Sequence, residues 1–286
     1  MKNFKSVSSI PVLLSAIVLV LSGCAHEEKH LAKTASPVPA KEVVAEVKAP
    51  TTSAVTQTAG LDQAALNRLK QMSDTLTTAQ TFTYHSKSFI ELQSPTTEQL
   101  LTFATHAEVA LQRPNKLQIN ASGDMPTLQF YFDGEKVSAL DVGKNFYAVS
   151  PPLTNIDEMV AYVLGKAKIN LPAADFLGSN PYAVMSKELT YASRVGESLV
   201  NGVLCDHYAY MEPNVDWEIW IQKGDKALPL RLSMTYKQAK SSPHFLVEFF
   251  DWKLNPKLSA KTFDFKKPKD AQQAEFGYYQ AEAAKK

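Results

Sequence analysis

Apolar and polar residues alternate with a period of two across residues 82–132 and again across residues 189–254. This period places successive side chains on opposite faces of a strand, so both stretches predict strands with one apolar and one polar face. The dipeptides Asp133-Gly134 and Asn201-Gly202 separate such runs, and Asn-Gly between alternating segments is a strong hairpin signal. The chain is therefore predicted to fold as an antiparallel meander of about ten or eleven strands.

Helical periodicity appears in residues 61–76 and again in residues 156–164, where apolar residues recur at three- and four-residue steps. Each spacing predicts one amphipathic helix. Asn155 is the expected N-cap of the second helix, with Glu158 at its third position. Two short helical pieces are expected at residues 173–177 and 181–185. The two apolar stripes, which could cover the apolar face of the sheet, are Leu61, Ala65, Leu69, Met72 and Leu76, and Ile156, Met159, Val160, Val163 and Leu164.

The strand periodicity also predicts which side chains face the helices. Phe130 and Phe132 share one face of their strand, and Tyr131 lies on the other. The polar atoms of Tyr131, Trp220 and Trp252 are expected to reach water on the convex side. The inward side chains either fill a core or line an apolar cavity, and the pattern leaves both readings open. The inward set is Leu101, Phe103, Val109, Phe130, Phe132, Trp217, Ile219, Ile221, Leu232, Met234, Val247 and Phe249.

The N-terminus has the features of a lipoprotein signal peptide. Lys2 and Lys5 precede an apolar run over residues 12–21 that is too short to span a membrane as a mature helix. The run Leu21-Ser22-Gly23-Cys24 resembles a lipobox, in which the cysteine thiol is diacylated and the chain is cut before it. We therefore expect residues 1–23 to be removed and Cys24 to hold the protein on a membrane through acyl chains.

The residues after Cys24 predict a tether rather than a domain. Residues 25–60 are rich in Ala, Pro, Val, Lys and Thr and contain no aromatic residue, so they cannot bury enough apolar surface to fold. The folded domain is expected at residues 61–277, followed by a tail at 278–286. Removal of residues 1–23 changes the formal net charge from +1 to −1. A nearly neutral chain lacks the basic excess of nucleic-acid-binding proteins.

Three patterns resemble catalytic motifs, and none is convincing. Residues 26–30 match H-E-x-x-H but lie in the predicted tether, where no helix would hold two imidazoles on one face. Gly196-Glu197-Ser198 lacks the closing glycine of a nucleophile elbow. Cys205 and His207 are two apart on one predicted strand, but a structural cysteine is commoner there than a nucleophile. We expect no enzymatic activity, no cofactor and no metal site.

Several longer segments carry a family resemblance. Their order and spacing are similar to those of domain-of-unknown-function family 2092, a family of bacterial envelope proteins, across about residues 61–277. The resemblance implies the architecture of the LolA and LolB lipoprotein carriers, an α+β and mainly β fold. In it a strongly curved antiparallel half-barrel has helices over its concave face and an apolar cavity. The matching segments are residues 69–73, 112–117, 130–136, 145–148, 171–177, 180–182, 191–196, 202–207, 216–221 and 228–231.

These observations lead to one main functional hypothesis and two alternatives. The protein is expected to be an envelope lipoprotein that binds a lipid, a lipoprotein acyl chain or another apolar ligand without catalysing a reaction. Ala25 follows the lipidated cysteine, which favours the periplasmic face of the outer membrane over the inner membrane or the cell surface. The second hypothesis is an envelope scaffold with a closed core and a protein partner. The third is a hydrolase.

Overall fold

The computed structural model describes residues 60–276 except 170 and 172. One sheet of twelve strands runs through this part of the chain in the order β12-β6-β5-β4-β3-β2-β1-β11-β10-β9-β8-β7. The strands are β1 (Thr81–Gln93), β2 (Leu100–Gln112), β3 (Lys116–Gly123), β4 (Leu128–Phe132), β5 (Val137–Asp141), β6 (Phe146–Val149), β7 (Tyr191–Val200), β8 (Val203–Met211), β9 (Val215–Gln222), β10 (Pro229–Tyr236), β11 (His244–Leu254) and β12 (Gln272–Gln273). The helices are α1 (Gln63–Thr78), α2 (Ile156–Gly165), α3 (Pro181–Met185) and the 3-10 turns η1 (Ala174–Phe176) and η2 (Ala260–Phe263).

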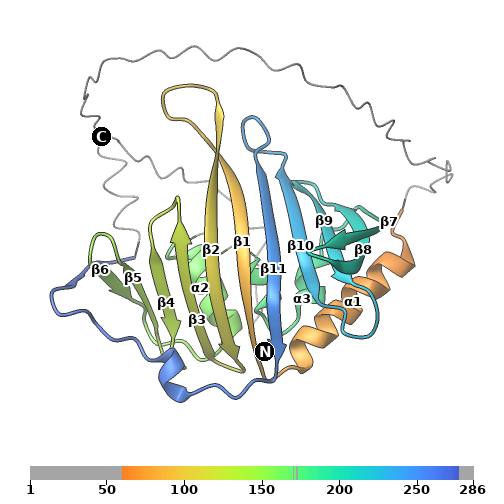
Figure 1. Ribbon diagram of the computed structural model, residues 1–286. Coiled ribbons are helices and arrows are strands. Elements are labelled where there is room, and N and C mark those ends of the chain that lie inside the picture. The colour runs from red at the N-terminus through yellow and green to blue at the C-terminus, as the bar shows by residue number, and fades with distance from the viewer. Residues whose placement is uncertain (1–59, 170, 172, 277–286) are drawn as a thin grey trace, which may run out of the picture. The chain divides into compact units, whose positions relative to one another are not determined.

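The predicted antiparallel half-barrel is confirmed, because the sheet is open and curved, with the helices against one face (Figure 1). Two meanders, β1–β6 and β7–β11, are joined by antiparallel pairing of β1 with β11. The predicted strand number was slightly too low. The extra strand, β12, has only two residues and pairs parallel with β6, so it produces no periodic signal.

Helix α1 buries the predicted apolar stripe, since Ala65, Leu69, Met72 and Leu76 are fully buried. Leu61 was wrongly included in that stripe: it is 48% exposed and forms a bridge to Ala192 before the helix begins. Asp62 is the N-cap and accepts a hydrogen bond from the Ala64 amide. In Figure 1, α1 crosses the β9–β11 side of the sheet, and α2 lies behind the β2–β3 side.

Helix α2 begins as the sequence predicted. Asn155 Oδ1 accepts a hydrogen bond from the Glu158 amide at 2.9 Å. The Glu158 carboxylate accepts two hydrogen bonds from Thr154, each of 2.8 Å, and these bonds lower the pKa of that carboxyl. Ile156, Met159 and Val163 are buried, so the stripe faces the core. The two short helical pieces also form, as η1 and α3.

The face assignment is confirmed for β4 but fails at the end of β11. Phe130 and Phe132 are buried, and Tyr131 is half-buried on the other face. Trp252 was predicted to be convex, but it packs against Tyr84 on the inner face, with ring centroids 4.5 Å apart and planes tilted by 37°. A β-bulge at Asp251, which has a positive φ of 55°, inserts one residue and reverses the alternation after it.

The outer face is partly covered by the C-terminal segment. Phe265 packs against Tyr131 with ring centroids 5.8 Å apart and against Tyr147 at 5.6 Å. Trp220 also lies on the outer face, as predicted, where it stacks on the His207 ring at 4.0 Å. Tyr131 and Trp220 are therefore half-buried by neighbouring side chains rather than simply solvated.

Candidate apolar binding site

A continuous apolar row crosses the inner face of the sheet. The strand registers place Phe103 opposite Ile90, Ile90 opposite Phe245, Phe245 opposite Met234, and Met234 opposite Trp217. Phe245 and Trp217 are buried, whereas Phe103, Ile90 and Met234 are half-buried. The β1–β2 hairpin extends beyond its neighbouring strands in Figure 1. Phe103 and Ile90, which lie on this hairpin, are the less buried end of the row.

Most of the predicted inward-facing residues belong to the packed core. Nine of the twelve are buried, and Leu101, Phe103 and Met234 are half-buried. Two pockets lie among the described residues, and none of the twelve lines either of them. Their assignment to an inner face holds, whereas a role in lining a cavity stays a prediction. The nine buried residues are Val109, Phe130, Phe132, Trp217, Ile219, Ile221, Leu232, Val247 and Phe249.

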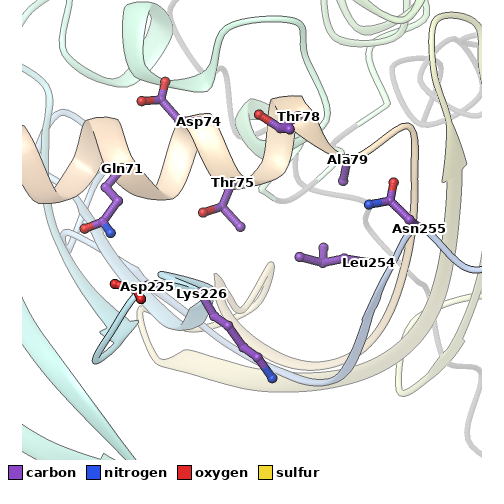
Figure 2. A pocket seen from close by; sticks show the side chains of 9 residues that line it. All are labelled: Gln71, Asp74, Thr75, Thr78, Ala79, Asp225, Lys226, Leu254 and Asn255. Carbon is purple, nitrogen blue, oxygen red and sulfur yellow. The ribbon is translucent and has the colours of Figure 1, made fainter.

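A pocket of about 480 Å³ lies between α1, the β9–β10 turn and the end of β11 (Figure 2). Thr75 projects from the helix towards the pocket, and Leu254 projects from the opposite side. Thr78 also belongs to the lining. Most of the atoms that form the pocket surface are apolar, although only Ala79 and Leu254 are apolar residues. The other lining residues are Gln71, Asp74, Asp225, Lys226 and Asn255.

Two sets of hydrogen bonds hold the walls of this pocket. Arg68 on α1 donates hydrogen bonds to the carbonyls of Gln222 and, at 3.1 Å, of Gly224, which fixes the β9–β10 turn beside the helix. Asn255 accepts a hydrogen bond from the Gln80 amide at 2.9 Å, which joins the end of β11 to the C-terminus of α1. These hydrogen bonds join α1 to the β9–β10 turn and to the end of β11, which are the segments that bound the pocket.

Sequence reasoning missed this pocket because its walls come from segments far apart in the chain. The one local signal is a helical row, since Gln71, Thr75 and Thr78 recur at four- and three-residue steps beside the apolar stripe of α1. Such a row usually marks a solvated face of a helix. This helical row lines a pocket only because the β9–β10 turn lies beside it in the folded protein.

Acidic groups with raised pKa values lie beside the apolar row. Burial raises the pKa of Asp175 in η1 and that of Glu212 in the β8–β9 turn, and Asp175 raises the latter further. Burial also raises the pKa of Tyr236 to about 12. Glu212 accepts a hydrogen bond from Trp217 Nε1 at 2.9 Å. Although Asp175 as a residue is half-buried, its carboxyl group has lost much of its hydration.

Asp175→Asn should therefore stabilise the fold at neutral pH. Because the folded protein holds the Asp175 proton more tightly than the unfolded chain does, the wild type loses stability as pH rises through and above the ordinary aspartate range of about 4. The variant lacks this loss. Thermal unfolding should show a higher melting temperature for the variant at pH 7 and convergence near pH 3. Asp270→Asn, a control at an exposed position, should leave the melting temperature unchanged at both pH values. Identical melting temperatures for Asp175→Asn and wild type at pH 7 would contradict the raised pKa of Asp175.

The residues considered for catalysis do not form an activated nucleophile. Cys205 is fully buried, its thiol donates a hydrogen bond to the Val203 carbonyl, and burial raises its pKa to about 11. His207 instead pairs with Glu218 at 2.7 Å. Gly196 and Ser198 lie within β7, which runs into a turn at Asn201 and Gly202.

The described residues contain neither a metal-binding cluster nor a membrane-spanning helix. Within residues 60–276, apart from 170 and 172, no group of three His, Cys, Asp or Glu side chains is arranged to hold a metal ion. In the same part of the chain, no helix is both long and apolar enough to cross a membrane. Cys24, the predicted tether with its H-E-x-x-H match, and the tail at 278–286 lie outside the described residues.

Solved structures with a similar fold share little sequence with this chain. An uncharacterized conserved protein from Thermus thermophilus has a TM-score of 0.44 and 13% identity, over 74% of this chain and 99% of that one. The Mycobacterium tuberculosis lipoprotein LppX has a TM-score of 0.40 and 13% identity, over 70% and 99%. LprF from Mycobacterium bovis has a TM-score of 0.39 and 12% identity, over 74% and 100%. Likeness at this level supports no functional argument.

The family comparison is more informative. No curated protein matches the chain. The family described as "Predicted periplasmic protein (DUF2092)" matches residues 65–277, which is nearly the whole of the predicted folded domain. The chain therefore belongs to this family of predicted periplasmic proteins.

Proposed function

We propose that this protein is a non-catalytic envelope lipoprotein that binds an acyl chain or a similar apolar ligand between α1 and the sheet. The pocket of about 480 Å³ beneath α1 carries the proposal. Its volume lies within the range of about 300–1,000 Å³ that is usual for small-ligand sites. Its surface consists mainly of apolar atoms, and polar and charged groups from seven of its nine lining residues lie around it, which suits a ligand with an apolar chain and a polar head.

The anchor proposed at Cys24 would place this domain beside its source of ligand. Acyl chains on Cys24 would hold the protein on a membrane, and Ala25 favours the periplasmic face of the outer membrane. The family description as predicted periplasmic supports the compartment. A carrier or sensor of envelope lipids needs both a membrane attachment and a site for an apolar chain, and this chain offers a candidate for each.

Ligand binding is tested by filling the pocket. Thr75→Phe places an aromatic ring into the space between α1 and Leu254, whereas Thr77→Phe makes the same change at a helix position outside the lining. The full chain, purified in detergent, is extracted and its lipids are analysed by mass spectrometry. A lipid bound by wild type and Thr77→Phe but lost from Thr75→Phe, with unchanged melting temperature, supports the site. Equal lipid content in all three proteins would refute it.

Anchoring should depend on Cys24 alone. Cys24→Ser removes the thiol that accepts the acyl chains, so the variant should be found as an uncleaved precursor or as a soluble protein. Membrane fractionation followed by mass determination distinguishes these forms. A Cys24→Ser protein that still fractionates with the outer membrane at mature size would contradict the lipobox assignment.

An envelope interaction module is the second candidate, and the β7 end of the sheet favours it. Five of the eight exposed large apolar residues in the described chain lie on β7 or β8 or bridge to β7: Leu61, Val195, Leu199, Leu204 and Met211. Leu199 and Leu204 form a cross-strand pair beside the β7–β8 turn, and neighbouring exposed apolar residues often mark a protein contact. A photo-crosslinker at position 199 should capture a protein partner in cells, while one at Val142, which is exposed elsewhere, should not.

A further inference from the structure

A second pocket, of about 400 Å³, is lined by a row of polar side chains in β1–β4. His85 lies opposite Glu108, Glu108 opposite Asn120, and Asn120 opposite Gln129. The residues next to these in the strands, Tyr84, Val109, Ile119 and Phe130, are buried in the core. The polar row therefore lies on the outer face of the sheet, opposite to the face covered by α1 and α2. We call this hollow the outer groove.

Aromatic and hydrogen-bonding groups converge at the outer groove. Phe250 lies opposite His85 at one end, with ring centroids 5.7 Å apart and nearly perpendicular planes. Asp251 bonds to His85 Nδ1 at 3.1 Å and sets the orientation of that imidazole. His106 and Ser122 line the groove beside the row. An imidazole, a carboxylate and two carboxamides thus stand side by side next to an aromatic ring.

Asn120 has an unused hydrogen-bonding group. Its Oδ1 is buried and finds no hydrogen-bond partner within the described chain. Buried acceptors are nearly always satisfied, so an orphaned one calls for an explanation. Rotation of the carboxamide would present this acceptor to the groove, where a donor from a ligand would satisfy it.

The chemistry of the lining selects among ligand classes. Among the described residues that line the outer groove, none is Lys or Arg, so a phosphate or another anion finds no permanent counter-charge, and the Glu108 carboxylate repels it. Strands β1–β3 are hydrogen-bonded to a strand on each side, and β4 pairs with both β3 and β5, so no open backbone edge offers a peptide a place to pair. A ligand rich in neutral hydroxyl groups fits, because carboxylate and carboxamide oxygens accept hydrogen bonds from hydroxyls and the carboxamide NH2 groups donate to them. An aromatic ring packs on an apolar sugar face.

We propose that the outer groove binds a neutral saccharide. The groove and the pocket under α1 lie on opposite faces of the sheet, so this proposal does not depend on lipid binding. The Glu108 carboxylate would accept hydrogen bonds from sugar hydroxyls, and the Gln129 carboxamide would both accept and donate them. Asn120 Oδ1 would accept from one further hydroxyl, and Phe250 would pack against the sugar ring.

The full chain, purified in detergent, is titrated with chitotetraose and with maltotetraose by calorimetry and saturation-transfer NMR. At least one sugar should receive saturation from the wild-type protein. Glu108→Ala and Gln129→Ala should each weaken its binding about tenfold or more, since each removes a hydrogen-bonding group from the groove. Gln118→Ala, two residues from Asn120 on the same face of β3 but outside the lining, should bind as wild type does.

Two results would overturn the proposal. One is that neither sugar receives saturation at millimolar concentration. The other is that binding persists unchanged in both Glu108→Ala and Gln129→Ala, provided that thermal unfolding shows them to be folded. Thr75→Phe, which fills the pocket under α1, should leave sugar binding intact. Loss of lipid with retention of sugar in that variant separates the two proposals.

Discussion

Phe249→Ala should lower the free energy of unfolding by about 3–5 kcal/mol, because it removes a fully packed ring and leaves a cavity. Phe249 is 2% exposed on the inner face of β11. Its ring lies 5.5 Å from those of both Tyr84 and Phe176, measured between centroids, so it joins the sheet to η1. Denaturant titration monitored by far-UV circular dichroism gives the difference directly.

Phe250→Ala is the matched control, since it makes the same change one residue later on the opposite face. Phe250 is half-buried and contacts His85 at the surface. Its loss should cost about 1 kcal/mol or less. Equal losses for the two variants would mean that the faces of β11 are wrongly assigned. A small loss for Phe249→Ala with altered ligand binding would instead indicate that this part of the core is an open cavity.

Arg113→Met should cost about 2–4 kcal/mol, because two carbonyl groups lose a charged donor in a partly buried setting. Arg113 donates a hydrogen bond to the carbonyl of Leu76, in the last turn of α1, at 3.3 Å and to that of Leu177, just after η1, at 3.1 Å. Carbonyls at a helix C-terminus lack partners within the helix. Arg113 therefore fastens two helical segments to the end of β2.

Arg113→Lys separates charge from geometry. A lysine keeps the positive charge, but its single ammonium group cannot reproduce the planar fork that reaches both carbonyls. We expect it to recover only part of the lost stability in the same denaturant titration. Arg194→Met, which removes a half-exposed arginine from an ion pair with Glu197, should cost less than about 1 kcal/mol. Full recovery by Arg113→Lys would show that charge, and not the two hydrogen bonds, is what matters.

Local patterns predicted most elements of the fold correctly. The period of two located the long strands, and Asn155 marked the start of α2 at Ile156, where its side chain accepts a hydrogen bond from the Glu158 amide. Phe130 lies inside and Tyr131 outside because alternation within a strand is a local property of the backbone. The same reasoning failed at Trp252, where the bulge at Asp251 adds a residue that no alternation reveals.

Neither pocket could be derived from sequence periodicity. The pocket under α1 depends on Arg68 holding the β9–β10 turn, whose residues are more than 150 positions away in the chain. The outer groove depends on the exact registers of β1 to β4, which place His85, Glu108, Asn120 and Gln129 in one row. A shift of one residue in any of these pairings would move its side chain to the other face.

The sequence by itself determined the strands and helices and the apolar face of most of them, because each is encoded in neighbouring residues. The lipidation of Cys24 stays a prediction. Only the tertiary structure decided that β1 pairs with β11 and that the bulge turns Trp252 inward. It also decided that Gln71, Thr75 and Thr78 of α1 line a pocket. These features arise from contacts between distant segments. Their energies depend on register and packing, which no local pattern of residues specifies.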